Sequence, residues 1–212
     1  MGRKLPSGRL AAVSALLILL FTGCAEKGPI LLMVGYQEPA ETAKAASKLT
    51  VAVSPFKDVR GKAPSVLGKK TIPSGRENDF VVQGTVAEIA TSGLKKALAS
   101  RGITVTDAPP WDLSAEGMKA GGAALLLGGE IKILWLESTA VALKTHLQAS
   151  VQIKVIAGDP SEKKIIRSVD VSSRLEQDLL YSREKLEDAL SEALSSAIDQ
   201  IFKDDDLKKR LQ

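Results

Sequence analysis

The chain has 212 residues, of which 44% are apolar and 25% charged, and it carries 29 Lys and Arg residues against 25 Asp and Glu. This length and apolar content are typical of a single globular domain and exclude a disordered chain. One cysteine and one histidine also exclude a disulfide scaffold and a metal site built from several nitrogen or sulfur ligands.

The N-terminus has the pattern of a bacterial export signal. Three basic residues precede an apolar run over residues 10–21, shorter than the about 20 residues that a membrane span needs. Residues 21–24, Phe-Thr-Gly-Cys, resemble a bacterial lipobox, in which the cysteine is acylated and becomes the first residue of the mature chain. The sequence therefore predicts a signal peptide over residues 1–23 and attachment of a lipid, such as palmitate, at Cys24. The alternatives are an uncleaved N-terminal anchor and ordinary cleaved secretion, and in all three cases the folded part lies outside the cytoplasm.

The predicted processing changes the charge of the chain. Residues 1–23 hold three basic and no acidic residues, so 26 basic residues remain against 25 acidic ones. A net charge near +1 gives nucleic-acid binding no electrostatic support. Ala25 and Glu26 follow the cysteine, in place of the aspartate that typically retains lipoproteins at the inner membrane. This favours the outer membrane, with the folded part facing the periplasm.

Residues 24–48 are rich in Ala, Glu, Lys, Pro and Gly, apart from an apolar island at residues 30–34. This composition is typical of a tether, with one short strand at the island. We therefore place a single folded domain at residues 49–212.

Within this domain, strands and helices follow from hydrophobic periodicity and turn residues. Glycines and prolines in residues 56–78 indicate a long loop. The first helix is placed at 79–100, although Thr85 and Glu88 have capping-box spacing, which would start the helix there and leave 80–82 extended. The predicted strands are 49–54, 103–106, 124–137, 141–157 and 165–175, and the predicted helices are 79–100, a brief one at 113–120, and 182–201 with Ser182 as its N-cap.

These elements predict an α+β domain, with a mainly antiparallel sheet, helices packed on one face of that sheet, and a C-terminal amphipathic helix. In the last predicted helix, an apolar stripe begins at Leu186 and faces the sheet. The opposite face, which includes Glu187, Ser191 and Ser195, is expected to meet water.

Strand alternation also places the histidine and the two tryptophans. His146 falls on the polar face of the predicted strand 141–157, as a solvated residue. Trp135 has the same parity as Ile131, which predicts core packing. Trp111 follows two prolines and is expected to be more exposed.

Six basic residues face a single acid, Asp58, between positions 57 and 76, which gives this segment a net charge of +5. This concentration favours contact with an anionic partner, such as lipid headgroups, lipopolysaccharide phosphates or an acidic protein. The alternative is a solvated loop in which Asp58 and Arg60 pair locally. The candidate contact residues are Lys57, Arg60, Lys62, Lys69, Lys70 and Arg76.

No catalytic constellation stands out in the sequence. The strings of a nucleophile elbow and of a phosphate-binding loop are absent, and we predict no catalytic residue, no metal site and no cofactor. A hydrolase that uses carboxylates such as Asp58 or Glu130 is the rival interpretation. A structural spacer within a larger complex is the third.

Three features together resemble the YajG-type family of bacterial envelope lipoproteins: Cys24, the V-x-V-S strand at residues 51–54, and the D-x-R sequence at residues 58–60. The resemblance extends by pattern over residues 30–210, and the Gly- and Pro-rich stretch after Arg60 departs from it. It implies an outer-membrane-associated lipoprotein without an established activity. We therefore expect a non-enzymatic, lipid-anchored protein whose domain binds an envelope protein or an anionic glycolipid, or assists an envelope assembly or transport complex.

Overall fold

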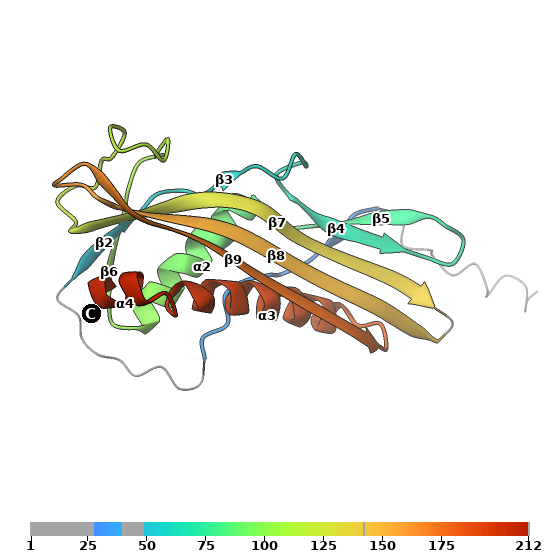
Figure 1. The fold of residues 1–212 in the computed structure, drawn as a ribbon. Coiled ribbons are helices and arrows are strands. Elements are labelled where there is room, and N and C mark those ends of the chain that lie inside the picture. The colour runs from blue at the N-terminus through green and yellow to red at the C-terminus, as the bar shows by residue number, and fades with distance from the viewer. Residues whose placement is uncertain (1–27, 40–48, 142, 212) are drawn as a thin grey trace, which may run out of the picture.

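The computed structural model describes residues 28–39, 49–141 and 143–211. In these residues nine strands form one mixed sheet whose long pairs are antiparallel, and three helices accompany it, so the fold class is α+β as the sequence predicts (Figure 1). The strands are β1 (Ile30–Leu31), β2 (Thr50–Val53), β3 (Lys57–Asp58), β4 (Val66–Thr71), β5 (Glu77–Val81), β6 (Thr104–Asp107), β7 (Leu125–Val141), β8 (Lys144–Asp159) and β9 (Lys164–Leu179). The helices are α2 (Val86–Ser100), α3 (Arg183–Ile201) and α4 (Asp205–Leu211).

The 17-residue strand β7 organises the sheet. Along one edge it pairs antiparallel with β8, which pairs antiparallel with β9, and these three strands form the meander that the sequence predicts. Along its other edge β7 pairs in turn with β2, β3 and β4, all parallel to it. The sheet therefore forks at β7, into a β2–β6 branch and a β4–β5–β1 branch (Figure 1).

A β-bulge in β7 reverses which side chains face the core. The register shifts between Ile131 and Ile133, so Ile131 is buried while Ile133 and Trp135 lie on the opposite face and are partly exposed. Leu134 and Leu136 take the core positions instead. The predicted core position of Trp135 is therefore wrong, because strict alternation ignores the extra residue that a bulge inserts.

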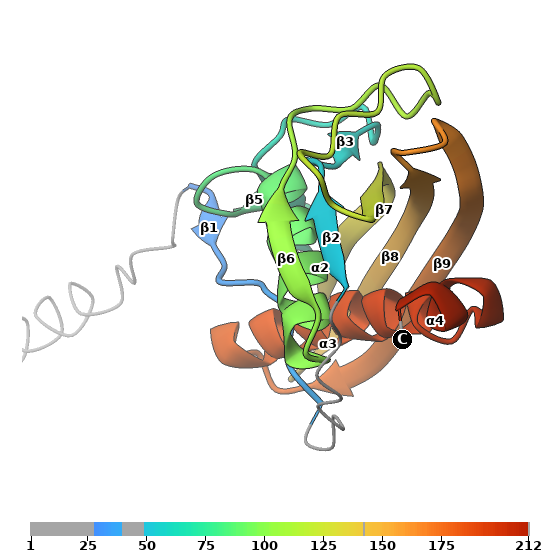
Figure 2. The ribbon, with the colours of Figure 1, turned by 90° about the vertical axis from the view of Figure 1, so that its left-hand side faces the viewer.

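Helix α3 lies against β8 and β9 and also contacts α2, and both helices share one core cluster with β7 and β8 (Figure 2). Helix α2 begins at Val86, with Thr85 as its N-cap. The Thr85 hydroxyl accepts a hydrogen bond from the Glu88 N–H, and the Glu88 carboxylate accepts one from the Thr85 N–H. This capping box sets the start of the helix, and residues 79–81 belong to β5, so the earlier start at residue 79 is wrong.

The segment 56–78, expected as one long loop, contains β3, β4 and the start of β5. Strands β4 and β5 form an antiparallel hairpin, and the N–H of Ile72 donates to the carbonyl of Arg76 at its turn. Gly68 lies within a strand and does not mark a loop. A Cβ on Gly68 would overlap the carbonyl oxygen of Leu136, so glycine is what allows β4 to approach β7 here.

The connection between β6 and β7 packs against a second, smaller cluster that includes apolar side chains of β2, β7 and β8. No helix forms over residues 113–120, and Trp111 is only 2% exposed. The Trp111 N–H donates to Ser54 Oγ, and its indole N–H donates to the carbonyl of Ser114. Asp112 Oδ1 accepts hydrogen bonds from the N–H and the hydroxyl of Ser114, a local turn that competes with a helix. The predicted brief helix and the predicted exposure of Trp111 are therefore both wrong.

Candidate functional site

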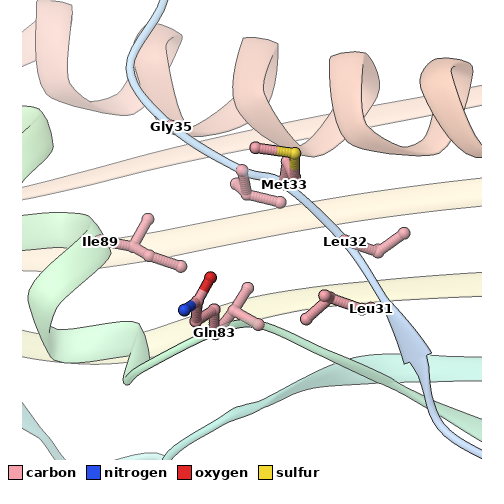
Figure 3. A pocket seen from close by; sticks show the side chains of 8 residues that line it. Leu31, Leu32, Met33, Gly35, Gln83 and Ile89 are labelled. Atoms are coloured by element: carbon pink, nitrogen blue, oxygen red, sulfur yellow. The ribbon is translucent and has the colours of Figure 1, made fainter.

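The described N-terminal residues, 28–39, are part of the fold, so the segment expected as a tether is structured here. We call them the strap. Strand β1 pairs with β5, and the chain then continues extended along α3 (Figure 3). Every second N–H of this extended part donates to a side chain of α3: Met33 to Glu187 (2.9 Å), Gly35 to Ser191 (3.2 Å) and Gln37 to Ser195 (2.8 Å).

The two backbone periodicities explain this contact. Two residues of extended chain advance about 6.6 Å, and four residues of helix advance about 6 Å, so alternate N–H groups meet side chains spaced four apart. The sequence pattern predicts that this face of α3 meets water, but the strap covers it, and Ser191 and Ser195 are buried. Small hydroxyl residues at this spacing, together with the apolar island at 30–34, are the sequence signal that indicates such a contact.

A polar cluster holds the strap at its C-terminal part. The Tyr36 hydroxyl donates to Asp199 Oδ1 at 2.8 Å, and the guanidinium of Arg101 contacts both the same carboxylate oxygen (2.8 Å) and the Tyr36 hydroxyl (3.2 Å). Burial raises the pKa of the Tyr36 hydroxyl above its ordinary value, so it remains a neutral donor. The cluster joins the strap to the C-terminal ends of α2 and α3.

An apolar groove lies between the strap, the end of β5 and the first turns of α2. Its volume is about 390 Å³. Figure 3 shows Leu31 and Met33 of the strap near Gln83 and Ile89. Met33 is 80% exposed and the neighbouring Leu31 is 49% exposed, so two large apolar side chains of the strap face solvent here. The lining residues are Leu31, Leu32, Met33, Val34, Gly35, Val82, Gln83 and Ile89.

The six basic residues predicted as an anionic contact have different surroundings in the structure. Arg60 is engaged inside the protein: its side chain is 3% exposed, and it forms a two-pronged ion pair with Asp58, with both hydrogen bonds at 2.8 Å. It also donates to the carbonyls of Val66 on β4 and Leu134 on β7. Arg60 therefore bridges the fork of the sheet, and the alternative of a local Asp58–Arg60 pair is the one that the structure shows.

The remaining five basic residues have separate surroundings. Lys57 and Arg76 are exposed. Lys62 lies over the ring of Trp135, with 5.4 Å between the ammonium and the ring centroid. Lys69 pairs with a neighbouring glutamate, and Lys70 lies 3.7 Å from the ring centroid of an aromatic residue, Tyr181.

The carboxylates named for the hydrolase interpretation are also placed. The Arg60 side chain holds the pKa of Asp58 below its ordinary value, which keeps Asp58 ionised and makes it a poor proton donor. Glu130 is partly exposed on β7, opposite Lys57 of β3. Within residues 28–39, 49–141 and 143–211, no group of three metal-ligating side chains occurs.

His146 is partly exposed on β8, where its Nδ1 lies 2.9 Å from Asp178 of β9, so this polar-face position agrees with the sequence analysis. Cys24, the predicted site of lipid attachment, lies outside the described residues. Among the residues that are described, no helix has the length and apolar content that crossing a membrane requires.

Comparison with known families identifies the class of protein. Residues 92–212, more than half of the chain, match the model of a family described as "Uncharacterized lipoprotein". The chain therefore belongs to this family of bacterial lipoproteins. No curated protein sequence matches it.

Three solved structures are similar to this chain at low sequence identity. A DUF330-family protein from Xanthomonas campestris is 8% identical with a TM-score of 0.55, covering 86% of this chain and 96% of that one. A neuraminyllactose-binding hemagglutinin homolog from Helicobacter pylori is 12% identical with a TM-score of 0.48, covering 85% and 97%. A lipoprotein from Neisseria meningitidis is 17% identical with a TM-score of 0.34, covering 73% and 99%. The first of these likenesses shows the fold alone.

Proposed function

We propose that this chain is a non-enzymatic, YajG-type envelope lipoprotein, attached to the outer membrane through Cys24 with its domain facing the periplasm. Membership of a lipoprotein family and the lipobox at residues 21–24 support the anchor. The domain binds a protein partner of the envelope, as an auxiliary part of an assembly or transport complex.

The apolar groove is the observation that carries the binding role. Met33 is largely exposed on its rim, and burying a side chain of this kind in a partner contributes about 1.5–3 kcal/mol. The groove adjoins β1, which is an edge strand of the sheet. An edge strand can pair with a strand from another chain, which supplies main-chain hydrogen bonds. The partner that fits is an extended segment with apolar side chains at alternate positions.

In-cell crosslinking tests this binding role. A photoreactive amino acid replaces Met33 in the full-length protein, and the matched control carries it at Glu162, an exposed position in the turn between β8 and β9. We expect a discrete adduct from position 33 whose mapped peptide is an apolar, extended segment of an envelope protein. The Ile89→Asp variant, which places a charge in the groove, should reduce that adduct.

Equal labelling at positions 33 and 162, or an adduct that is unchanged by Ile89→Asp, contradicts binding at the groove. Normal membrane fractionation of each variant shows that it is exported and anchored, and normal resistance to proteolysis shows that it is folded. An adduct that maps to a polar loop of the partner contradicts the proposed strand pairing.

The other interpretations have less support. Because Asp58 is held ionised by Arg60, it cannot be the proton donor of a carboxylate pair, and a second carboxyl group would have to supply the proton. Contact of all six basic residues with one anionic glycolipid has less support, since the Arg60 side chain is engaged by Asp58 and Lys62 lies over the ring of Trp135.

A further inference from the structure

The N-terminal end of the strap and one end of the sheet lie together. Ile30 of β1 is level with Phe80 of β5, Phe80 with Gly68 of β4, and Gly68 with Leu136 of β7. Strand β1 runs parallel to β5, and β5 runs away from the β4–β5 turn. The chain therefore enters β1 from the end of the sheet that carries the β4–β5 and β7–β8 turns (Figure 1).

Exposed apolar side chains gather at this same end. Leu143, in the turn between β7 and β8, is 90% exposed, and Leu180, directly after β9, is 67% exposed. The β8–β9 register places Leu180 beside the β7–β8 turn, because Thr145 is level with Leu179. Four of the eight large exposed apolar residues in the described ranges lie here. We call them the apolar end: Val141, Leu143, Leu180 and Tyr181.

Basic side chains flank the apolar end. Lys144 and Arg76 are exposed, and Lys70 lies over the ring of Tyr181. The acid Glu77 in the same hairpin is already paired with a lysine of β4. The acid Asp178 of β9 lies 2.9 Å from His146 Nδ1. Apolar and tyrosine side chains with lysine and arginine beside them are typical of a surface that lies in the headgroup region of a membrane.

We propose that the apolar end lies in the headgroup region of the membrane to which Cys24 anchors the chain. This end of the domain then faces the lipid. The inference rests on the lipid attachment of the proposed function. Cys24 is six residues before Ile30, a span of at most about 20 Å for an extended chain. Val141 is five residues beyond Leu136, about 17 Å along β7. The anchor therefore reaches the level of the apolar end but not far beyond it.

A lipid surface suits this end better than a protein partner does. Its two most exposed residues, Leu143 and Leu180, lie in a turn and directly after a strand, so they protrude, whereas the groove at Met33 is hollow. A fluid headgroup layer receives protruding side chains without a matching shape. The two surfaces thus have different occupants.

Fluorescence quenching tests this orientation. Because Cys24 is the only cysteine and is acylated in the proposed protein, an introduced cysteine is the sole free thiol. Leu143→Cys and Leu180→Cys in the full-length, processed lipoprotein are labelled with an environment-sensitive fluorophore. The matched control is Glu162→Cys, at the opposite end of the sheet. Each protein is reconstituted into vesicles of phosphatidylethanolamine and phosphatidylglycerol that carry a nitroxide-labelled lipid.

We expect the labels at 143 and 180 to lose most of their fluorescence and to show blue-shifted emission, while the label at 162 keeps both in their aqueous state. Vesicle flotation measures the anchor separately. Proteins that float with the vesicles but show no quenching at 143 and 180, or equal quenching at all three positions, overturn the orientation and leave the anchor intact. Failure to float contradicts the lipid attachment itself.

Discussion

The Asp58–Arg60 pair at the fork of the sheet gives a sharp test of the fold. Arg60→Met keeps an apolar stem but removes the guanidinium, which leaves the Asp58 carboxylate and the carbonyls of Val66 and Leu134 without this donor. Loss of one partner from a buried ion pair costs about 3–5 kcal/mol. Since the Asp58 side chain is 16% exposed, water compensates part of this loss, and we expect a cost of about 3 kcal/mol.

The measurement is urea unfolding of the mature chain carrying Cys24→Ser, monitored by tryptophan fluorescence. Arg60→Met should lower the free energy of unfolding by about 3 kcal/mol, a large part of the 5–15 kcal/mol typical of a domain. The double variant Asp58→Asn with Arg60→Met should regain part of this loss because no charge remains unpaired. The exposed control Lys57→Met should change stability by less than about 0.5 kcal/mol.

A cost below about 1 kcal/mol for Arg60→Met, the range of a surface ion pair, would refute the bridging role. An equal cost for Lys57→Met would also contradict it. The loss of stability would then come from removing a positive charge in this segment and not from the burial of the Arg60 side chain.

Further predictions concern the strap, the fork and acid stability. Ser191→Ala with Ser195→Ala removes two acceptors of strap N–H groups, so we expect the free energy of unfolding to fall by about 1 kcal/mol for each. Hydrogen exchange should become faster only in the strap, and unchanged exchange contradicts the contact. Gly68→Ala should strongly destabilise the chain because its Cβ overlaps a β7 carbonyl, whereas Gly35→Ala, which meets nothing within 4 Å, should be nearly neutral in the same unfolding assay. The lowered pKa of Asp58 stabilises the fold above the unfolded pKa of about 3.9, and this contribution disappears as the pH falls through the folded pKa. Wild type should therefore lose more stability than Asp58→Asn on acidification below about pH 4, and equal losses in urea titrations contradict this.

Local signals in the sequence predicted local structure well. The alternation in residues 141–157 predicted the central strand of the meander. Thr85 and Glu88 carried the capping box that starts α2, although the apolar periodicity favoured the wrong start at residue 79. The D-x-R spacing likewise contained the Asp58–Arg60 pair as one of two alternatives. Each of these features depends on residues that are close in sequence, so their pattern is visible in one segment.

The fork and the strap depend on contacts between distant residues. Strand β4 pairs with β7 at residues nearly seventy positions away, and its sequence, Val-Leu-Gly-Lys-Lys-Thr, gives no alternation to indicate burial. The strap hydrogen bonds join residues more than 150 positions apart. The bulge before Ile133 has no sequence signature and reversed the face of Trp135. Three non-local features therefore account for the main differences between the predicted and observed folds.

The candidate site was missed for the same reason. The groove combines Met33 of the strap with Ile89 of α2, whereas the sequence offered only the basic residues of one segment. The one sequence signal for the groove was the apolar island at residues 30–34, which is not typical of a solvated tether.

Fatty-acid labelling tests the central claim most directly. Wild type and Cys24→Ser are expressed with a radiolabelled fatty acid, and the inner and outer membranes are separated. We expect label on the wild type alone, in the outer-membrane fraction. Absence of label from the wild type, or equal label on Cys24→Ser, would contradict a lipid-anchored envelope lipoprotein.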